Sequence, residues 1–330
     1  MGDRMKTVKI DQNNANQRID KFLVKYLPNA PKSFIYKMIR KKDVKVNGKK
    51  VNENYITKLN DEISLFLYED MFLKFAGKKD IYDLKPSFKV VYEDDQILIV
   101  DKPAGLLVHE DKNESIHTLS NEVLSYLKQK GEYEDSLENT FVPGPVHRLD
   151  RNTSGIVIFG KTLPALQALN EMMKQRHYIE KKYYTIVKGK ITKDQELMNY
   201  VKKVEEGKMR IVSSKDPEGL KMHTLIHPLE YNKDFTLLEV GIVTGRTHQI
   251  RIHMASIDHP VIGDSKYGDF ELNKIIKKQY HLDHQYLHAH QIKFVKTLAP
   301  LDYLNGQTFR APLSKKLSQI KKEIFNKPTK

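Results

Sequence analysis

The chain has 330 residues, of which 39% are hydrophobic and 30% are charged, and its formal net charge is +14. This length allows two domains, and the composition is that of a globular protein. No cysteine is present, which excludes disulfides, thiolate catalysis and sulfur-ligated metal sites.

Membrane insertion and secretion find no support in the sequence. No apolar run approaches the roughly 18 residues that a transmembrane helix needs. The first residues, MGDRMKTVKIDQ, lack the apolar segment of a secretion signal. We therefore expect a cytoplasmic protein that has no membrane partner.

The positive charge is concentrated at the two ends of the sequence. Residues 1–50 contain 14 Lys or Arg and 4 Asp or Glu, a net charge of +10, and residues 310–330 carry a net charge of +6. Basic surfaces of this kind bind nucleic acid, because phosphate contacts release counterions. The alternative is an ordinary solvated surface rich in lysine.

The N-terminal segment shows the pattern helix, helix, hairpin. Apolar residues recur at helical spacing over residues 17–27 and again over residues 33–39. Asn47 and Gly48 then lie between valines, which is a strong signal for a hairpin turn. This order resembles the S4-type RNA-binding domain, and a generic small basic module is the alternative. The resemblance implies a stripe of basic side chains that faces phosphates: Lys37, Arg40, Lys41, Lys42 and Lys45, with Lys49 and Lys50.

The rest of the chain is dominated by short predicted strands. Residues 68–87 lack clear periodicity and are interpreted as a linker. Strands are predicted over residues 88–92, 97–100, 183–187, 235–243 and 291–295. A helix is predicted to start at Thr162, an acidic loop covers residues 131–139, and a short amphipathic helix with a frayed tail ends the chain. We predict an α+β protein with an N-terminal domain over residues 1–67 and a mixed, largely antiparallel sheet domain over residues 88–330.

The segment HRLDRNTSG, residues 147–155, holds the most informative candidate site. Asp150 lies between Arg148 and Arg151 on a short polar turn, and an apolar strand follows. A carboxylate beside guanidinium groups stays ionised and can act as a nucleophile or base. Local chemistry alone favours a purely structural turn, because Asp and Asn commonly bond to their own backbone.

Residues 147–155 resemble the signature of the RluA/RluC/RluD family of RNA pseudouridine synthases. Three further segments agree with that family in order: DKPAGLLVH at 101–109, KYYTIVKG at 182–189, and TGRTHQIRIH at 244–253 followed by HPVIGDSKYG at 259–268. The resemblance covers roughly residues 88–315. It implies an isomerase that converts uridine in RNA to pseudouridine, on a catalytic domain that follows a small αβ S4-type domain.

The resemblance also implies the roles of individual residues. Asp150 is the expected catalytic residue; it would attack C1′, add to the base, or remove a sugar proton. Arg251 is its expected basic partner, which keeps the carboxylate ionised. Tyr183 is the expected active-site tyrosine, with a ring for the uracil to stack on and a hydroxyl to help remove the C5 proton. Arg148 is expected to help displace the target base from its stack.

Other candidate residues are given weaker roles by their positions. If residues 244–253 form a strand, Arg246 lies at an odd offset from Arg251 and faces the other side. Tyr184 likewise faces away from Tyr183 and is expected to pack. Several histidines cluster late in the chain, at positions 281, 284, 288 and 290, but the spacing HExxH of zinc enzymes is absent. We expect no metal and, without a phosphate-binding or dinucleotide fingerprint, no cofactor.

The sequence thus favours a pseudouridine synthase that acts on RNA, with 23S ribosomal RNA as the expected substrate. A tRNA-uridine synthase of the same family and a non-catalytic rRNA-binding assembly factor are the alternatives. A hydrolytic glycosidase is a third alternative, but it lacks a convincing partner acid. We expect a monomer without an obligate protein partner.

Overall fold

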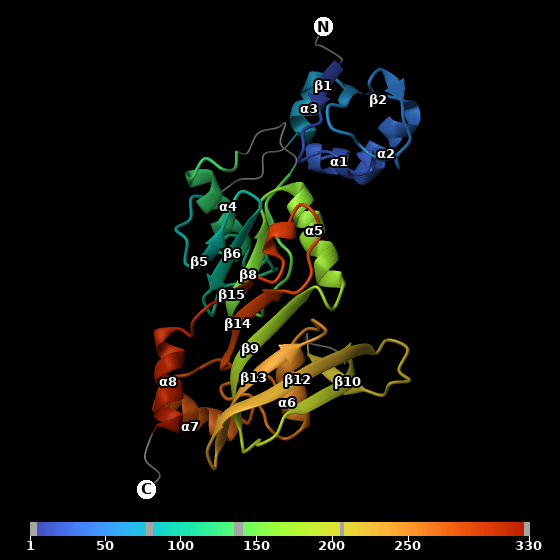
Figure 1. The fold of residues 1–330 in the computed structure, drawn as a ribbon. Coiled ribbons are helices and arrows are strands. Elements are labelled where there is room, and N and C mark those ends of the chain that lie inside the picture. The colour runs from blue at the N-terminus through green and yellow to red at the C-terminus, as the bar shows by residue number, and fades with distance from the viewer. Residues whose placement is uncertain (1–4, 77–81, 135–140, 205–207, 327–330) are drawn as a thin grey trace.

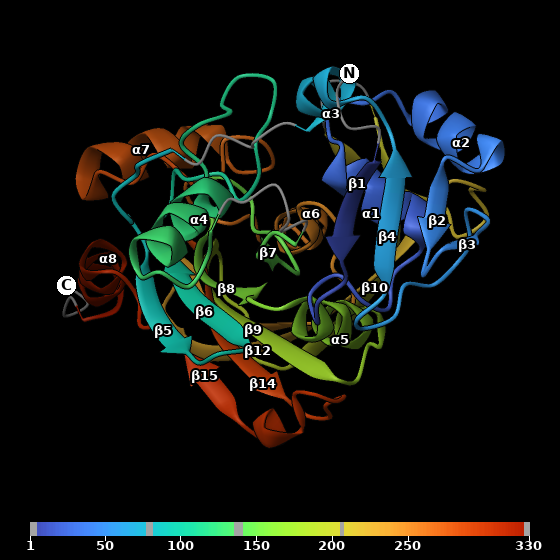
Figure 2. The same ribbon diagram turned by 90° about the horizontal axis from the view of Figure 1, so that it is seen from above.

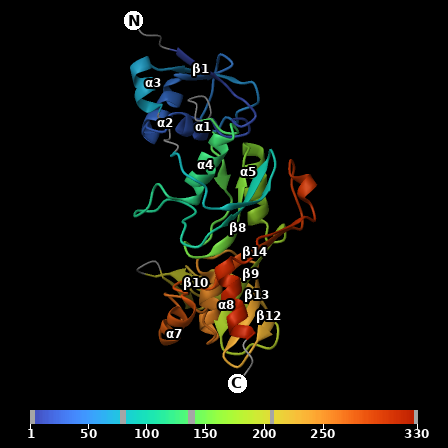
Figure 3. The same ribbon diagram turned by 90° about the vertical axis from the view of Figure 1, so that its left-hand side faces the viewer.

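The computed structural model describes residues 5–76, 82–134, 141–204 and 208–326. An N-terminal domain with a four-stranded sheet precedes a larger part built on an eleven-stranded sheet. The N-terminal domain lies at one end of an elongated molecule, and the C-terminal helices lie near the other (Figures 1 and 3). The predicted α+β architecture is confirmed.

The N-terminal domain combines the two predicted helices with an antiparallel sheet. Helices α1 (Ile19–Tyr26) and α2 (Lys32–Lys41) pack their apolar faces into one core with the strands. The sheet order is β1 (Met5–Lys9), β4 (Glu62–Phe66), β2 (Val44–Val46) and β3 (Lys49–Lys50). The predicted hairpin joins β2 to β3, and Asn47 and Gly48 both have positive φ, 50° and 74°. These left-handed residues give the turn the twist that a two-residue hairpin needs.

The interpretation of residues 68–87 as a linker is partly wrong. Its first part forms helix α3 (Glu69–Phe75), and the buried Phe72 packs in the N-terminal core beside Tyr26. The helix is too short for its periodicity to stand out in the sequence. Residues 77–81 of the segment lie outside the described residues. The position of the domain boundary itself stays a prediction.

The large sheet is antiparallel throughout its described pairs except for one parallel pair. Its main path runs β11-β10-β12-β13-β9-β14-β8-β6-β5, and β7 and β15 pair at its side. The parallel pair joins β8 to β14. The strands are β5 (Lys89–Glu93), β6 (Ile97–Lys102), β7 (Gly144–Pro145), β8 (Ser154–Gly160), β9 (Ile179–Lys188), β10 (Gln195–Lys203), β11 (Met209–Val212), β12 (Leu220–Tyr231), β13 (Phe235–Ile242), β14 (Leu287–Phe294) and β15 (Thr308–Arg310).

Helices cover both faces of this sheet, so its central strands are buried on both sides. Along β6, Leu98 and Val100 face the core that contains α4 (Leu119–Gln129), while Ile97 and Ile99 face α5 (Leu163–Lys174). Helices α6 (Gln249–Ser256), α7 (Phe270–Tyr280) and α8 (Lys315–Phe325) complete the larger part. Because both of their faces are covered, β6 and β8 have sequences that are continuous apolar runs.

Helix α5 also contacts the N-terminal domain. The hydroxyl oxygen of Thr162 accepts from Ala165 N–H and caps the helix, as predicted. The next amide, Leu163 N–H, donates to Asn13 Oδ1 at 3.2 Å. The two parts therefore meet at the start of α5, and Figure 2 shows the N-terminal sheet beside this helix.

Three expectations concern the C-terminal helix, the tail that follows it and the acidic loop at residues 131–139. Helix α8 confirms the predicted amphipathic helix, and the tail at 327–330 lies outside the described residues. So do residues 135–140, which make up most of the predicted acidic loop. None of the helices in the described ranges has the length and apolar character needed to cross a bilayer.

Candidate active site

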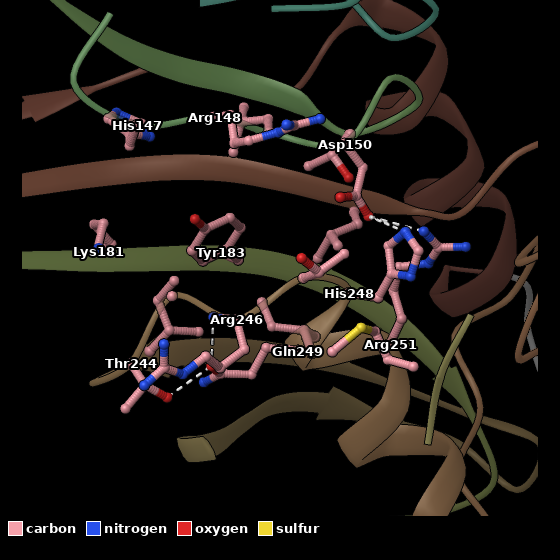
Figure 4. A pocket seen from close by; sticks show the side chains of 18 of the residues that line it. His147, Arg148, Asp150, Lys181, Tyr183, Thr244, Arg246, His248, Gln249 and Arg251 are labelled. Atoms are coloured by element: carbon pink, nitrogen blue, oxygen red, sulfur yellow. Dashed lines mark hydrogen bonds and ion pairs between the residues drawn. The ribbon is translucent and has the colours of Figure 1, made fainter. Parts of the chain in front are cut away.

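A cleft of about 1090 Å³ opens at the turn that carries Asp150. Three segments form it: residues 146–153, the middle of β9, and residues 242–251 (Figure 4). Asp150 hangs from the turn toward α6, and Tyr183 lies on the strand beneath it. The site residues expected from the sequence in the larger part therefore meet in one cleft.

Backbone contacts hold the Asp150 turn in place. Thr153 N–H donates to the carbonyl of Asp150, and Gly105 N–H donates to the carbonyl of Arg151. The ammonium of Lys102 lies beneath the turn and donates to three carbonyls, those of Pro103, Leu106 and Arg151, at 2.8–3.0 Å. Burial lowers the pKa of Lys102 to about 7, against the charges of Asp150 and Asp101. Three carbonyl oxygens stabilise the ammonium form, so Lys102 ties two loops together.

The strand that follows the turn needs a glycine at its start. Gly155 has φ +111°, and a Cβ there would lie 2.2 Å from the carbonyl oxygen of Ala289 on β14. Any side chain at this position would clash with the backbone of β14, so only glycine allows β8 and β14 to lie this close. The glycine of HRLDRNTSG thus lets the turn sit at a close approach of two backbones.

Arg251 binds Asp150 directly, but from a helix. Its Nη1 donates to Asp150 Oδ2 at 2.8 Å. The expectation that residues 244–253 form a strand is wrong, because α6 starts at Gln249. The strand argument that placed Arg246 on the opposite face fails with it, and Arg246 lines the same cleft as Arg251.

A second carboxylate fixes the guanidinium of Arg251. Asp264 accepts from Nε at 2.6 Å and from Nη2 at 2.8 Å, and its side chain is only 1% exposed. Burial alone lowers the pKa of Arg251, but its bonds to Asp264 and Asp150 outweigh this and raise it. Burial likewise raises the pKa of Asp264, and the bonds from Arg251 bring it below its usual value. The pair presents the third nitrogen, Nη1, to Asp150 in one fixed direction.

Tyr183 forms the wall of the cleft on β9. The residue is 7% exposed, and burial and then the charge of Asp150 raise its pKa. The phenol is therefore protonated at neutral pH, so it offers an O–H and an aromatic face. Tyr184 points to the other side of the sheet, where its ring stacks on His290 with centroids 3.6 Å apart, as expected from strand alternation.

Two further side chains extend the cleft beyond Tyr183. His147 Nε2 accepts from Ile158 N–H at 3.2 Å and anchors the turn, and burial, with the charge of Lys181, lowers its pKa to about 3. The Lys181 ammonium lines the cleft beside Met173 Sδ, 4.0 Å away, and makes no ion pair within the described part of the chain. Burial lowers the pKa of Lys181.

The arginines at the cleft mouth differ in their contacts. Arg148 is exposed and lines the mouth, which suits a role against a displaced base. Arg246 also lines the cleft, and its Nε donates to the carbonyl of Lys221 at 3.2 Å. Part of the Arg246 guanidinium is therefore committed to the protein backbone.

The predicted basic stripe lies on the N-terminal domain, away from the cleft residues. Lys37, Arg40 and Lys41 are exposed on α2, and Lys42 ends this helix in the left-handed conformation. Lys45 on β2 lies with its ammonium 4.7 Å from the ring centroid of Phe66. The stripe and the cleft therefore belong to different parts of the molecule: Figure 1 shows α2 in the N-terminal domain and α6, which carries Arg251, in the larger part.

The late histidines serve the fold. His288 on β14 bonds to Ser154 Oγ through Nδ1 at 2.9 Å and to the carbonyl of Ala311 through Nε2 at 3.0 Å. His281 ends α7 in the left-handed conformation. In the described ranges no group of three or more His, Asp or Glu side chains is arranged to hold a metal ion.

Sequence reasoning missed four residues of this site: Lys102, Asp264, His248 and Tyr267. Asp264 and Tyr267 stand in the quoted segment GDSKYG, but no spacing rule links them to Arg251. Lysine is rarely buried, so the position of Lys102 beneath the Asp150 turn carried no local signal.

Comparison with known proteins gives consistent results. The family model described as RNA pseudouridylate synthase matches residues 96–256, and the S4 domain model matches residues 17–63. A protein of Mycoplasma genitalium described as an uncharacterized RNA pseudouridine synthase is 34% identical over 291 residues, covering 87% of this chain and 88% of that protein. Ribosomal large subunit pseudouridine synthase C of Buchnera aphidicola is 32% identical over 313 residues, covering 89% and 93%. The structure of human RNA pseudouridylate synthase domain containing 4 shares the fold, with a TM-score of 0.55 at 20% identity over 70% of this chain and 90% of that one.

Proposed function

Because the chain belongs to the RNA pseudouridylate synthase family, we propose that it isomerises specific uridines of 23S ribosomal RNA and that Asp150 is its catalytic residue. One observation carries the assignment of Asp150. Its carboxylate lies in the cleft with a side chain 26% exposed, and Arg251 holds one oxygen at 2.8 Å. One oxygen is therefore paired with a guanidinium, and the group stays open to a substrate.

The reaction breaks the N1–C1′ bond of uridine, turns the uracil and joins C5 to C1′, while C5 loses its proton and N1 gains one. Attack on C1′, addition to the base and removal of a sugar proton all need a carboxylate oxygen beside the nucleoside, and Arg251 holds the Asp150 carboxylate in the cleft. Tyr183 offers the uracil a stacking face, and its phenol enters the reaction protonated. Arg148, at the cleft mouth, would occupy the place that the target base leaves.

The choice of 23S rRNA rests on two observations. The relatives from Buchnera aphidicola and Vibrio cholerae are named ribosomal large subunit pseudouridine synthase C, at 32% and 31% identity. The exposed basic residues of α2 add a surface that fits structured RNA. We further propose that the protein works as a cytoplasmic monomer on this RNA.

The buried carboxylate next to Asp150 does not supply what hydrolysis of the glycosidic bond needs. A hydrolase needs a second carboxylate to activate water. Asp264 shares Arg251 with Asp150, but both of its oxygens are bound by the guanidinium.

Mapping pseudouridine in a deletion strain tests the proposal. Loss of one or more pseudouridines from 23S rRNA, restored by the wild-type gene and not by Asp150→Asn, is the expected result. Asp150→Asn keeps size and polarity and removes the charge, so RNA binding should survive. If the missing pseudouridines lay in tRNA, the substrate assignment would be wrong. If Asp150→Asn restored them, the catalytic assignment would be wrong.

A further inference from the structure

His248 lies between Tyr267 and the catalytic carboxylate. It directly precedes α6 and has φ 55°, in the left-handed region that non-glycine residues seldom adopt. Such a conformation costs free energy and persists where the surroundings hold it, often at functional sites. The close-up view shows its ring beside Arg251 and facing Asp150 (Figure 4).

A chain of hydrogen bonds favours one position for the proton of the His248 ring. The backbone N–H of Met209 donates to the hydroxyl oxygen of Tyr267 at 3.0 Å. The same hydroxyl lies 2.9 Å from His248 Nδ1. Met209 N–H can only donate, so it occupies an acceptor position of the Tyr267 oxygen and leaves the hydroxyl proton available to Nδ1. A neutral imidazole that accepts at Nδ1 carries its proton on Nε2.

The surroundings of His248 favour this neutral form. Burial lowers its pKa, the charges of Arg251 and Lys266 lower it further, and those of Asp150 and Asp264 oppose the shift. The rings of Tyr267 and His248 pack edge to face, with their centroids 5.5 Å apart. A neutral ring with a defined tautomer is a directional donor, and here its donor atom is Nε2.

The Nε2 atom points to the same carboxylate oxygen that Arg251 holds. His248 Nε2 lies 3.8 Å from Asp150 Oδ2, and Arg251 Nη1 lies 2.8 Å from it. Within the described part of the chain, Asp150 Oδ1 has no hydrogen bond or ion pair. Two donors therefore converge on one oxygen and leave the other free.

We propose that His248 is a positioning residue for Asp150: its Nε2–H donates to Oδ2 when RNA fills the cleft, which leaves Oδ1 as the oxygen that reacts. This inference rests on the proposed function of Asp150 and adds a partner and an atom to it. The distance of 3.8 Å is too long for a hydrogen bond, and contacts of catalytic groups commonly shorten in the substrate complex. Tyr267 takes part by fixing the tautomer.

Substitutions of His248 separate this role from a structural one. In His248→Gln the side-chain amide reaches the position of Nε2 and keeps a donor there. In His248→Asn the amide ends near Nδ1, the donor to Asp150 is lost, and the left-handed backbone is well tolerated. Single-turnover rates on 23S rRNA fragments should fall about 10- to 100-fold in His248→Asn and recover in His248→Gln. RNA affinity should be the same for both.

Tyr267→Phe provides the second measurement. It removes the hydroxyl that fixes the tautomer, so the rate should fall by less than in His248→Asn. Tyr184→Phe loses a hydroxyl on the other face of the sheet and is the matched control, with an unchanged rate. ¹⁵N NMR of the imidazole should show the proton on Nε2 in the wild-type protein and a mixture of tautomers in Tyr267→Phe.

Failure of this inference differs from failure of the proposed function. If the wild-type protein formed no pseudouridine in 23S rRNA, the function assignment would fail, and the NMR measurement would still decide the tautomer. A proton on Nδ1 of wild-type His248 would overturn the inference whatever the activity. So would a wild-type rate for His248→Asn in an active preparation, or equal rates for His248→Asn and His248→Gln.

Discussion

Removal of the charge of Asp264 should cost more stability than any exposed substitution in this protein. Asp264→Asn keeps the shape of the side chain but turns one of its two acceptor oxygens into an N–H donor that faces the Arg251 guanidinium. The side chain is 1% exposed, and Oδ1 also accepts from the backbone N–H groups of Lys266 and Tyr267 at 2.8 and 3.1 Å. Breaking a buried, hydrogen-bonded ion pair costs about 3–5 kcal/mol, which is the loss we expect in the free energy of unfolding at pH 7.

The loss should depend on pH in a defined direction. The pKa of Asp264 is lowered in the folded protein, so the pair contributes fully above the unfolded pKa of about 4. The contribution then disappears as the pH falls through the lower folded pKa. The difference between wild type and Asp264→Asn should therefore be constant near neutral pH and shrink in acid.

Urea unfolding followed by circular dichroism, at pH 7 and at steps down toward pH 3, measures this difference. Glu271→Gln is the control, because its ion pair with Lys274 is exposed on both sides and contributes little. Single-turnover kinetics should also show a slower reaction in Asp264→Asn, since Arg251 loses the group that aims it at Asp150. A stability loss below about 1 kcal/mol, or one that grew in acid, would refute the reasoning.

Four further outcomes are expected. Arg251→Lys keeps the charge but lacks the planar fork, so single-turnover rates should fall about 100-fold with unchanged circular dichroism; a wild-type rate would count against it. In binding titrations across salt concentrations, Lys181→Met should weaken RNA binding and lower the salt slope by about one, whereas Lys182→Met, on the other face of the strand, should not. Lys41→Glu should raise the RNA concentration needed for half-maximal rate and leave the saturated rate unchanged; loss of the saturated rate would contradict the separation of stripe and cleft. Exhaustive chelation should leave activity intact, and restoration of a chelator-inactivated enzyme by zinc would contradict this.

Local signals predicted the elements that depend on local chemistry. The hairpin at Asn47 and Gly48 follows from two residues that tolerate positive φ, and α5 follows from the cap at Thr162 and the proline after it. In both cases the few residues that define the element also stabilise it. The motif that holds Asp150 is also a run of consecutive residues, but its assignment came from the resemblance to a family and not from local chemistry.

Helix α6 shows why the rest of the site could not be predicted. Ile250 and Ile252 alternate with polar residues, which is typical of a strand. Every residue from Gln249 to Met254 is buried, polar ones included. A helix buried on all sides has no solvent-facing stripe, so its sequence lacks the helical period. The contact of Arg251 with Asp264 depends on this helix and could not be inferred without it.

The position of β14 in the middle of the sheet has a consequence for synthesis of the protein. This strand lies between β9 and β8. Gln285, just before β14, donates to the hydroxyl oxygen of Thr153 at the end of the Asp150 turn, and His288 on β14 bonds to Ser154 at the start of β8. More than 130 residues separate these partners in the chain. The N-terminal domain, by contrast, needs only residues up to Phe75. Domains fold as they leave the ribosome, and pairings between distant residues form late. A nascent chain should thus gain the basic surface of its N-terminal domain while the Asp150 turn is still unformed, so activity should begin only when nearly the whole chain has been made.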